Sequence, residues 1–187
     1  MAGESGRGAR LAVVVYSDFL CPWCWSAATR LAAVEAALDG ALALEWRSYL
    51  LRLRPRPRSP ESLAAFRAYT KGCQRVADDE PRAPLRPWQG DAGPPTHSLP
   101  AHLAAKAAAA LGAEPGRRMR ERLFRAYFAE SRDISDPATL GALWAELGLP
   151  QAAGARFDDP ALEAGVQVEL EAARPLADNV GGAVRLA

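Results

Sequence analysis

The sequence has few cysteines, few histidines and no long hydrophobic run. Its 187 residues include 3 cysteines and 2 histidines. Three cysteines are too few for a disulfide-stapled scaffold, which is rare in the cytoplasm in any case. No apolar run approaches the roughly 18 residues of a membrane span, and the polar, glycine-rich stretch 1–10 lacks the features of a secretory signal. We therefore expect a cytoplasmic protein without a membrane partner.

The chain also lacks an excess of charge of either sign. Its 23 lysines and arginines oppose 22 aspartates and glutamates, which gives a formal net charge of +1. Such a chain offers no global attraction to polyanions, so we expect no nucleic-acid partner. Hydrophobic residues make up 49% of the sequence. This composition excludes a wholly disordered or collagen-like chain and predicts one globular domain, or a small domain with an insertion.

Two of the cysteines stand three residues apart in the segment Cys21-Pro22-Trp23-Cys24. The β-branched run 11–16 before them predicts a buried strand. Apolar residues at helical spacing after them predict a helix that ends at Asp39-Gly40, and residues 42–50 predict a second strand. A Cys-x-x-Cys pair at the strand-to-helix turn of a βαβ unit is typical of redox chemistry rather than zinc binding.

The place of Cys21 at the predicted helix start indicates an acidic, exposed thiol. Unpaired N–H groups and the helix dipole stabilise a thiolate there, and Pro22 is well suited to the first helical turn. Cys24 lies within reach of Cys21 but deeper in the helix and less exposed. We therefore expect Cys21 to attack a disulfide and Cys24 to resolve the mixed disulfide.

The remaining cysteine and the two histidines favour passive roles. Zinc binding and two inert cysteines are the alternatives to a redox motif, but Cys73, His97 and His102 stand at spacings unsuitable for completing a zinc site, so we expect no metal. We interpret Cys73 as a passive small side chain rather than a third redox partner. The two histidines are interpreted as capping or core residues.

Residues 51–60 alternate arginine with proline or leucine. This run could bind an acidic partner or a phosphate, but we favour an extended connector with solvated guanidiniums. Ser59-Pro60 then predicts the start of a helix that ends at Gly72. The proline-rich stretch 78–96 predicts a long loop, in which Trp88 either pins the loop to the body or helps to line a pocket.

Four further helices are expected after this loop. Apolar residues recur at helical spacing from Leu99 to Gly112, over 119–128, from Pro137 to Gly148 and from Pro160 toward Pro175. The aromatic residues of these segments are predicted to belong to the core rather than to a cofactor site.

The order of these segments resembles the DsbA-like branch of the thioredoxin superfamily, in particular the FrnE-like group. Relatives of that group are the 2-hydroxychromene-2-carboxylate isomerases and the kappa-class glutathione transferases. The resemblance covers nearly the whole chain and rests on four segments, which are 16–25 with its CPWC motif, 100–103 (PAHL), 123–136 and 146–149.

The resemblance implies an α/β, thioredoxin-like fold with an all-helical insertion domain. Residues 11–58 would form its N-terminal βαβ half, and 59–149 the insertion with the loop 78–96. Residues 150–187 would form the return helix and a final short strand, with the family's C-terminal β-β-α part truncated. The family's cis-proline loop has no counterpart, because 179–186 contain no proline. One sheet edge would then lack its cover, which leaves an oligomer open.

The resemblance also implies a function, a cytoplasmic thiol–disulfide oxidoreductase with Cys21 as nucleophile and Cys24 as resolving thiol. Its substrate would be a protein or small-molecule disulfide or thiol, with no cofactor beyond glutathione as a redox partner. The alternatives are a glutathione-dependent isomerase or transferase acting on aromatic compounds, and a binding or chaperone-like module. The predicted substrate-binding residues are Pro22, Trp23, Trp25, Trp88, Gly181 and Gly182.

Overall fold

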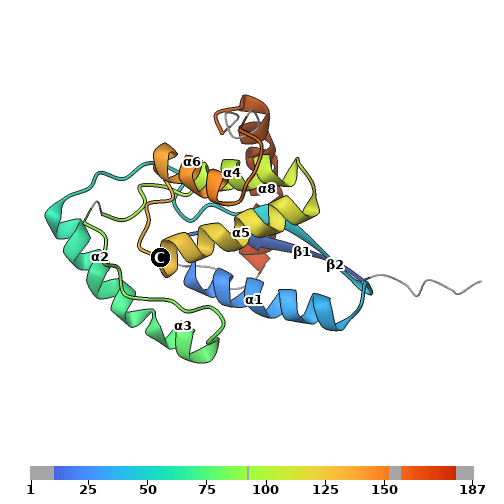
Figure 1. Ribbon diagram of the computed structural model, residues 1–187, viewed down its shortest axis with the longest axis horizontal. Helices are drawn as coiled ribbons and strands as arrows, with labels where there is room; N and C mark the ends of the chain where they lie inside the picture. Colours follow the sequence, from blue (N-terminus) through green and yellow to red (C-terminus); the bar gives the residue numbers. More distant parts are fainter. Residues whose placement is uncertain (1–10, 92, 152–156, 180–187) are drawn as a thin grey trace, which may run out of the picture.

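The structure is a computed structural model that describes residues 11–91, 93–151 and 157–179. It is a mixed α/β fold, mostly helical with a small sheet (Figure 1). In chain order its elements are β1 (Leu11–Ser17), α1 (Pro22–Ala37), β2 (Leu42–Ser48), α2 (Pro60–Gly72), α3 (Gln74–Asp79), α4 (Leu99–Ala109), α5 (Ala113–Phe128), α6 (Pro137–Glu146) and α8 (Pro160–Asn179).

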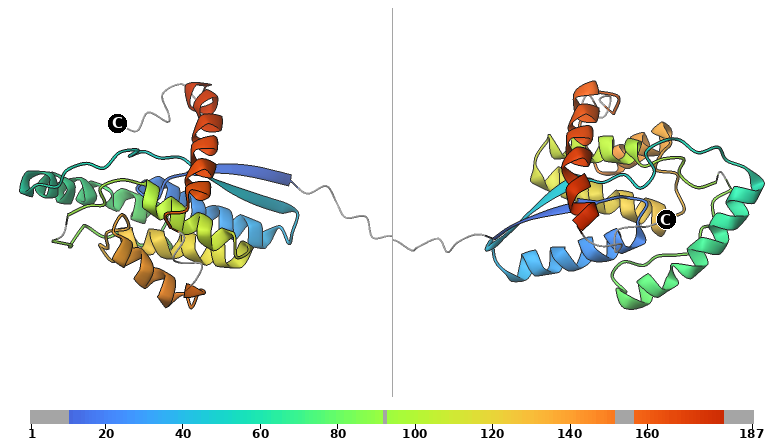
Figure 2. Two further views of the ribbon diagram at one scale, coloured as in Figure 1. Left: turned by 90° about the horizontal axis from the view of Figure 1, so that it is seen from above. Right: turned by 180° about the vertical axis from the view of Figure 1, so that it is seen from behind.

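The predicted βαβ unit is present, but its first strand is not buried. β1 and β2 pair in parallel, with Leu11 opposite Leu42 and Ser17 opposite Ser48. The expected burial of β1 is wrong, since Leu11 is 62% exposed and Val14 43%. Within the described residues the sheet has only these two strands, so each strand has an unpaired edge. Figure 2 shows α8 on one side of the strands and α1 on the other, each covering only part of them.

The helix starts that were predicted from capping residues are confirmed. Ser59 begins α2 with a reciprocal capping box, in which its hydroxyl accepts from the Ser62 amide at 3.1 Å and the Ser62 hydroxyl accepts from the Ser59 amide at 2.9 Å. Asp136 begins α6 by accepting from the Thr139 amide at 2.9 Å. In both helices a proline occupies the first turn, where its missing N–H costs nothing.

The hydrophobic core is built around α5, whose aromatic residues are buried as predicted. The turn that carries the cysteine motif is anchored in this core. Trp25 stacks on Phe124 and Phe128, with ring centroids 6.4 and 5.9 Å apart, and Phe19 lies 5.0 Å from Phe124. Aromatic pairs at these separations contribute beyond their buried area, so the motif has a fixed position against α5.

Helices α2 and α3 lie at the edge of the molecule, away from the sheet (Figure 1). α2 ends at Gly72 as predicted, whereas the six-residue α3 was not expected. Residues 80–91 and 93–98 contain no helix or strand, in agreement with the predicted long loop. Helices α2 and α3 together are called the arm, and the arm forms a wall that faces the start of α1.

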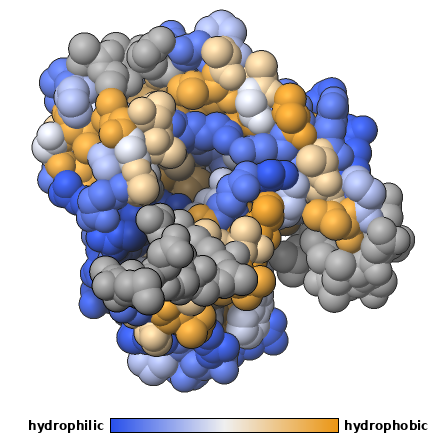
Figure 3. Space-filling view, turned by 90° about the vertical axis from the view of Figure 1, so that its right-hand side faces the viewer, coloured by the Kyte–Doolittle hydropathy of each residue, from blue (hydrophilic) through white to orange (hydrophobic). Residues whose placement is uncertain are grey.

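The surface mixes hydrophobic and hydrophilic groups. Figure 3 shows one face on which hydrophobic surface lies between hydrophilic groups around a hollow. None of the described helices combines the length and the apolar character needed to cross a membrane.

Candidate functional site

The two cysteines of the motif lie at the N-terminus of α1, as the sequence predicted. Cys21 is the residue before the helix, with an extended backbone, and Pro22 occupies the first turn. The Cys24 amide donates to the Cys21 carbonyl at 3.1 Å, which closes the first turn. Both cysteines are free thiols. The two cysteines of such a pair lie about one helical turn apart, so their side chains are neighbours.

The two thiols lie close enough for each to affect the pKa of the other. The pKa of Cys24 is lowered to about 7, chiefly because its thiolate accepts a hydrogen bond from the Cys21 thiol. The Asp18 amide and the Ser17 hydroxyl lower it further. The pKa of Cys21 is raised, first by the same hydrogen bond and then by burial, although the helix-start amides of Cys24 and Trp23 act in the opposite direction. The two thiols together therefore have one lowered pKa, which belongs to the pair.

The exposure predicted for the pair is wrong. Cys21 is only 3% exposed, whereas Cys24 is half-buried. The cause is tertiary, since the chain after β2 and the arm of α2 and α3 close over the start of α1 around a cavity. Cys21 lines this cavity and Cys24 does not. Cys21 is thus shielded from bulk solvent, yet it is the cysteine of the pair that borders the cavity.

A buried carboxylate fixes the turn that carries Cys21. Asp18 is 1% exposed and accepts two short hydrogen bonds of 2.6 Å, from the amides of Leu20 and Leu51. Burial raises the pKa of Asp18, while these amides and the Ser98 hydroxyl oppose the rise. The carboxylate therefore joins the motif turn to the chain after β2 and to the start of α4.

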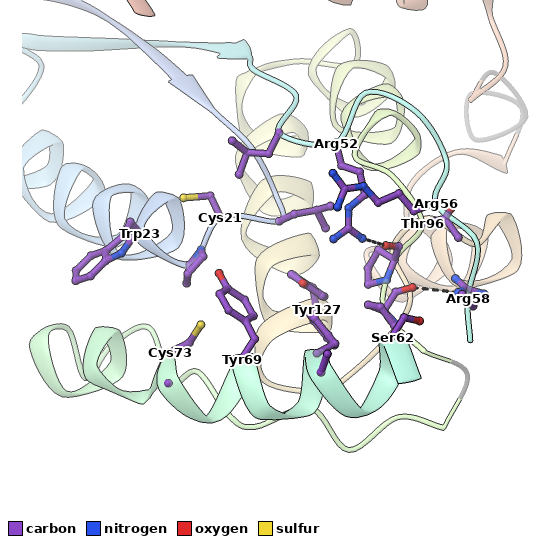
Figure 4. A pocket seen from close by; sticks show the side chains of 18 of the residues that line it. Cys21, Trp23, Arg52, Arg56, Arg58, Ser62, Tyr69, Cys73, Thr96 and Tyr127 are labelled. Carbon is purple, nitrogen blue, oxygen red and sulfur yellow. Dashed lines mark hydrogen bonds between the residues drawn. The ribbon is translucent and has the colours of Figure 1, made fainter. Parts of the chain in front are cut away.

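The cavity has a volume of about 750 Å³ and a sulfur-bearing end opposite an arginine-bearing end. Figure 4 shows Cys21 and Trp23 at one end, Arg52, Arg56 and Arg58 at the other, and tyrosines between them. The described lining contains four arginines and no aspartate or glutamate. The cavity is therefore strongly cationic although the whole chain has a net charge of only +1.

The arginine–proline run is the extended connector that we predicted, but its guanidiniums are not all solvated. It runs beside residues 94–98, since the Arg56 amide donates to the Thr96 carbonyl at 3.1 Å. Arg52 donates to the Pro95 carbonyl at 2.6 Å, and Arg58 pairs with Asp133. The sequence analysis missed these arginines as site residues. The available signal was the run of arginines itself, which could bind an acidic partner or a phosphate.

The predicted substrate-binding residues separate into three groups. Pro22 and Trp23 line the cavity, and Trp23 is 41% exposed with the Arg75 guanidinium 5.9 Å from its ring centroid. Trp25 and Trp88 are each 4% exposed and pack in the core instead. The last two lie outside the described residues, namely Gly181 and Gly182.

The histidines occupy the places expected of capping or core residues. His97 is half-buried, with its ring Nδ1 2.9 Å from the Thr96 hydroxyl. His102 is buried with its ring centroid 4.8 Å from that of Phe19. Within the described residues, no group of three or more histidine, cysteine and acidic side chains is placed to hold a metal ion.

Comparison with known families accounts for this geometry. The family model described as a DSBA-like thioredoxin domain matches residues 12–177. The chain belongs to this family. The resemblance inferred from the sequence is thereby confirmed, as is the thioredoxin-like α/β fold. No curated protein matches the chain.

Solved structures of DsbA-like proteins share the fold. The chain is 26% identical to the cytosolic disulfide reductase DsbM from Pseudomonas aeruginosa, with a TM-score of 0.72 over 92% of this chain and 81% of that chain. DsbM with glutathione gives a TM-score of 0.70 at 26% identity, over 92% and 82%. A 2-hydroxychromene-2-carboxylate isomerase is 20% identical, with a TM-score of 0.55 over 87% and 79%, and shares the fold alone. The chain therefore has the fold of DsbA-like oxidoreductases and their isomerase relatives.

Proposed function

We propose that this protein is a cytoplasmic thiol–disulfide oxidoreductase that uses the dithiol of Cys21 and Cys24 on small, carboxylate-bearing disulfides. The observation that carries the proposal is the cavity, in which Cys21 at a helix start lies at one end and a set of arginines at the other (Figure 4). The cytoplasmic location is supported by the name of the similar reductase DsbM.

The closely spaced pair supports a two-step exchange. Cys21 loses its proton to Cys24 or to water, and its thiolate attacks one sulfur of a bound disulfide. A Cys21–substrate disulfide forms and the first substrate thiolate leaves. Cys24 then gives its proton to the released thiolate, directly or through water, and attacks the Cys21 sulfur, which releases the second thiolate and leaves a Cys21–Cys24 disulfide. The substrate gains the two electrons that the dithiol loses.

The arginines support a carboxylate-bearing substrate such as glutathione disulfide. Each glutathione unit has two carboxylates at a distance from its sulfur, which suits a cavity with the reactive thiol at one end and guanidiniums at the other. Arg56 makes no side-chain hydrogen bond or ion pair with any described residue, so its guanidinium is free to bind such a ligand. A structure of DsbM with glutathione is consistent with this class of ligand.

Trapping the mixed disulfide tests the assignment of the two thiols. Treated with glutathione disulfide, the Cys24→Ser variant should accumulate a glutathione adduct on Cys21, located by peptide mass spectrometry. The matched Cys21→Ser variant should show no adduct on Cys24, because Cys24 does not line the cavity. Absence of an adduct on Cys21 would overturn the proposal. Glutathione transfer to aromatic compounds that survives loss of Cys24 would instead place the chain with the isomerases and transferases.

A pair of arginine variants tests the substrate class. Arg56→Ala should raise KM for glutathione disulfide about tenfold, the usual loss for a hydrogen bond to a charged group. Arg54→Ala is the matched control, because Arg54 is exposed on the same connector but does not line the cavity. Equal KM values for both variants and the wild type would show that the arginines do not select the substrate.

A further inference from the structure

Helix α2 presents one face to the dithiol across the cavity. The α2 residues that line the cavity follow helical spacing, and Cys73 directly after the helix continues the same face. The adjacent side of the helix contains Leu63, which packs on the core, and Thr70, which is buried. The residues that line the cavity from this wall are Ser62, Ala65, Phe66, Tyr69, Gly72 and Cys73.

Tyr69 is the polar side chain of this wall that faces the cysteine end of the cavity. In Figure 4 its hydroxyl points toward the turn that carries Cys21, and the Cys73 sulfur points to the same side. Tyr69 and Cys73 are close enough on this wall for each to affect the pKa of the other. The Tyr69 ring is steadied by stacking on Phe66, with centroids 6.1 Å apart. The phenol is therefore held on the cavity wall opposite the reactive thiol.

We propose that Tyr69 is a catalytic hydrogen-bond donor that stabilises the substrate thiolate as it leaves during attack by Cys21. The inference rests on the proposed function and adds a residue from the helical arm to the dithiol. When the disulfide breaks, negative charge develops on the departing sulfur inside the cavity. Rotation about the C–O bond of Tyr69 turns its hydroxyl hydrogen toward that sulfur.

To donate a hydrogen bond, the phenol of Tyr69 must stay protonated, and its surroundings raise its pKa. Tyr69 is 55% exposed, and the partial burial of its side chain, with the neighbouring Cys73, raises its pKa to about 12. A phenol with this pKa does not give its proton to a thiolate of ordinary basicity, so it acts as a donor and not as an acid. Cys73 has its own pKa raised by burial and remains a thiol beside the phenol.

The dependence on the leaving thiol distinguishes this role from a structural one. A donor to the departing sulfur helps most when the leaving thiol is basic, because more negative charge collects on it. Tyr69→Phe should therefore slow exchange with glutathione disulfide, which releases an aliphatic thiolate, about tenfold in kcat. With the mixed disulfide of glutathione and thionitrobenzoate, which releases an acidic aromatic thiol, the rate should change less than about twofold.

Tyr49→Phe is the matched control, because Tyr49 is half-buried and does not line the cavity. This variant should exchange both substrates at wild-type rates. If Tyr69→Phe slows both substrates equally, or slows neither, the donor role is wrong while the oxidoreductase assignment stands. If the wild-type protein exchanges neither substrate through Cys21, it is the proposed function that fails.

Discussion

Helices α1 and α5 have the same length and opposite surroundings. Each has sixteen residues, but α1 buries three of them and α5 buries seven. The buried residues of α1 are confined to its first turns, whereas those of α5 continue to its last residue. The difference shows that the fold fixes the start of α1, where the dithiol lies, and leaves the rest of this helix on the surface.

The anchor between the two helices is aromatic. Trp25, one residue after the motif, stacks on two rings of α5, and Phe19 before the motif contacts one of them. Beyond this anchor, Val34 and Leu38 are 45% and 44% exposed. The geometry of the dithiol therefore depends on α5 more than on the outer half of its own helix.

Truncation of one side chain in each helix gives the largest expected contrast. Phe124→Ala on α5 removes a ring that is 1% exposed and contacts both Phe19 and Trp25. It should lower the free energy of unfolding by about 3–5 kcal/mol. Val34→Ala on α1 removes a half-exposed side chain, and alanine favours the helix, so the change should stay within about 0.5 kcal/mol.

Urea unfolding of both variants at pH 7 measures this contrast. Phe124→Leu, which keeps most of the buried volume, is the control and should lose less than Phe124→Ala. Similar losses for the α1 and α5 alanine variants would show that the outer half of α1 is packed as firmly as α5, and the comparison would fail.

The sequence predicted the elements whose signals are local. Ser59-Pro60 and Asp136-Pro137 begin their helices because the capping side chain and the first-turn proline act within four residues. α3 escaped prediction because it has six residues, and its preceding residue, Cys73, makes no side-chain capping hydrogen bond. The burial of β1 was mispredicted for a different reason, since it depends on how many strands and helices cover it.

The stability of the core next to the cysteine motif should depend on pH, because a buried histidine lies there. His102, on α4, is buried against Phe19, and its Nε2 has no hydrogen-bond partner among the described residues. Burial, and then the charge of Lys106, lower the pKa of His102 to about 3. The unfolded chain protonates this histidine near pH 6.5, so stability is lost as pH falls below 6.5.

Between pH 7 and pH 5 this loss should reach about 2 kcal/mol, because about one extra proton binds to the unfolded chain below pH 6.5. Urea unfolding at the two pH values measures it, and His102→Leu should remove it. The control His97→Leu should retain most of the loss, since His97 is only half-buried. An unchanged pH dependence in His102→Leu would show that water reaches the ring.

The candidate site could be predicted only where its residues are neighbours in sequence. The place of Cys21 before α1 followed from the strand, the proline and the helix around it. Its burial did not, because the covering residues, such as Tyr69 and Arg52, come from segments folded back over it. The lowered pKa of the pair has the same origin in three dimensions, since it depends on how closely the two sulfurs approach each other.

The smallest expected effect concerns the outer part of α1, which is joined to the arm by ion pairs. Arg30 donates to Asp79 at 2.8 Å and to Glu80 at 3.2 Å, at the end of α3. Arg30 and Asp79 are half-exposed, and the buried Glu80 keeps Arg82 as a second partner. Pairs of half-exposed groups contribute about 0–1 kcal/mol, so Arg30→Ala should lower the free energy of unfolding by about 0.5 kcal/mol. The local effect should be larger, with faster hydrogen exchange at the α3 amides.

The matched control is Arg117→Ala, since Arg117 pairs with Glu114 and Glu121 within α5 itself. It should cost a similar small free energy and leave exchange in α3 unchanged. If Arg30→Ala also leaves α3 exchange unchanged, then α3 is held by its own packing, through Val76, and not by α1. In that case the wall that carries Tyr69 would be positioned independently of the helix that carries Cys21, and the two sides of the cavity would move as separate units.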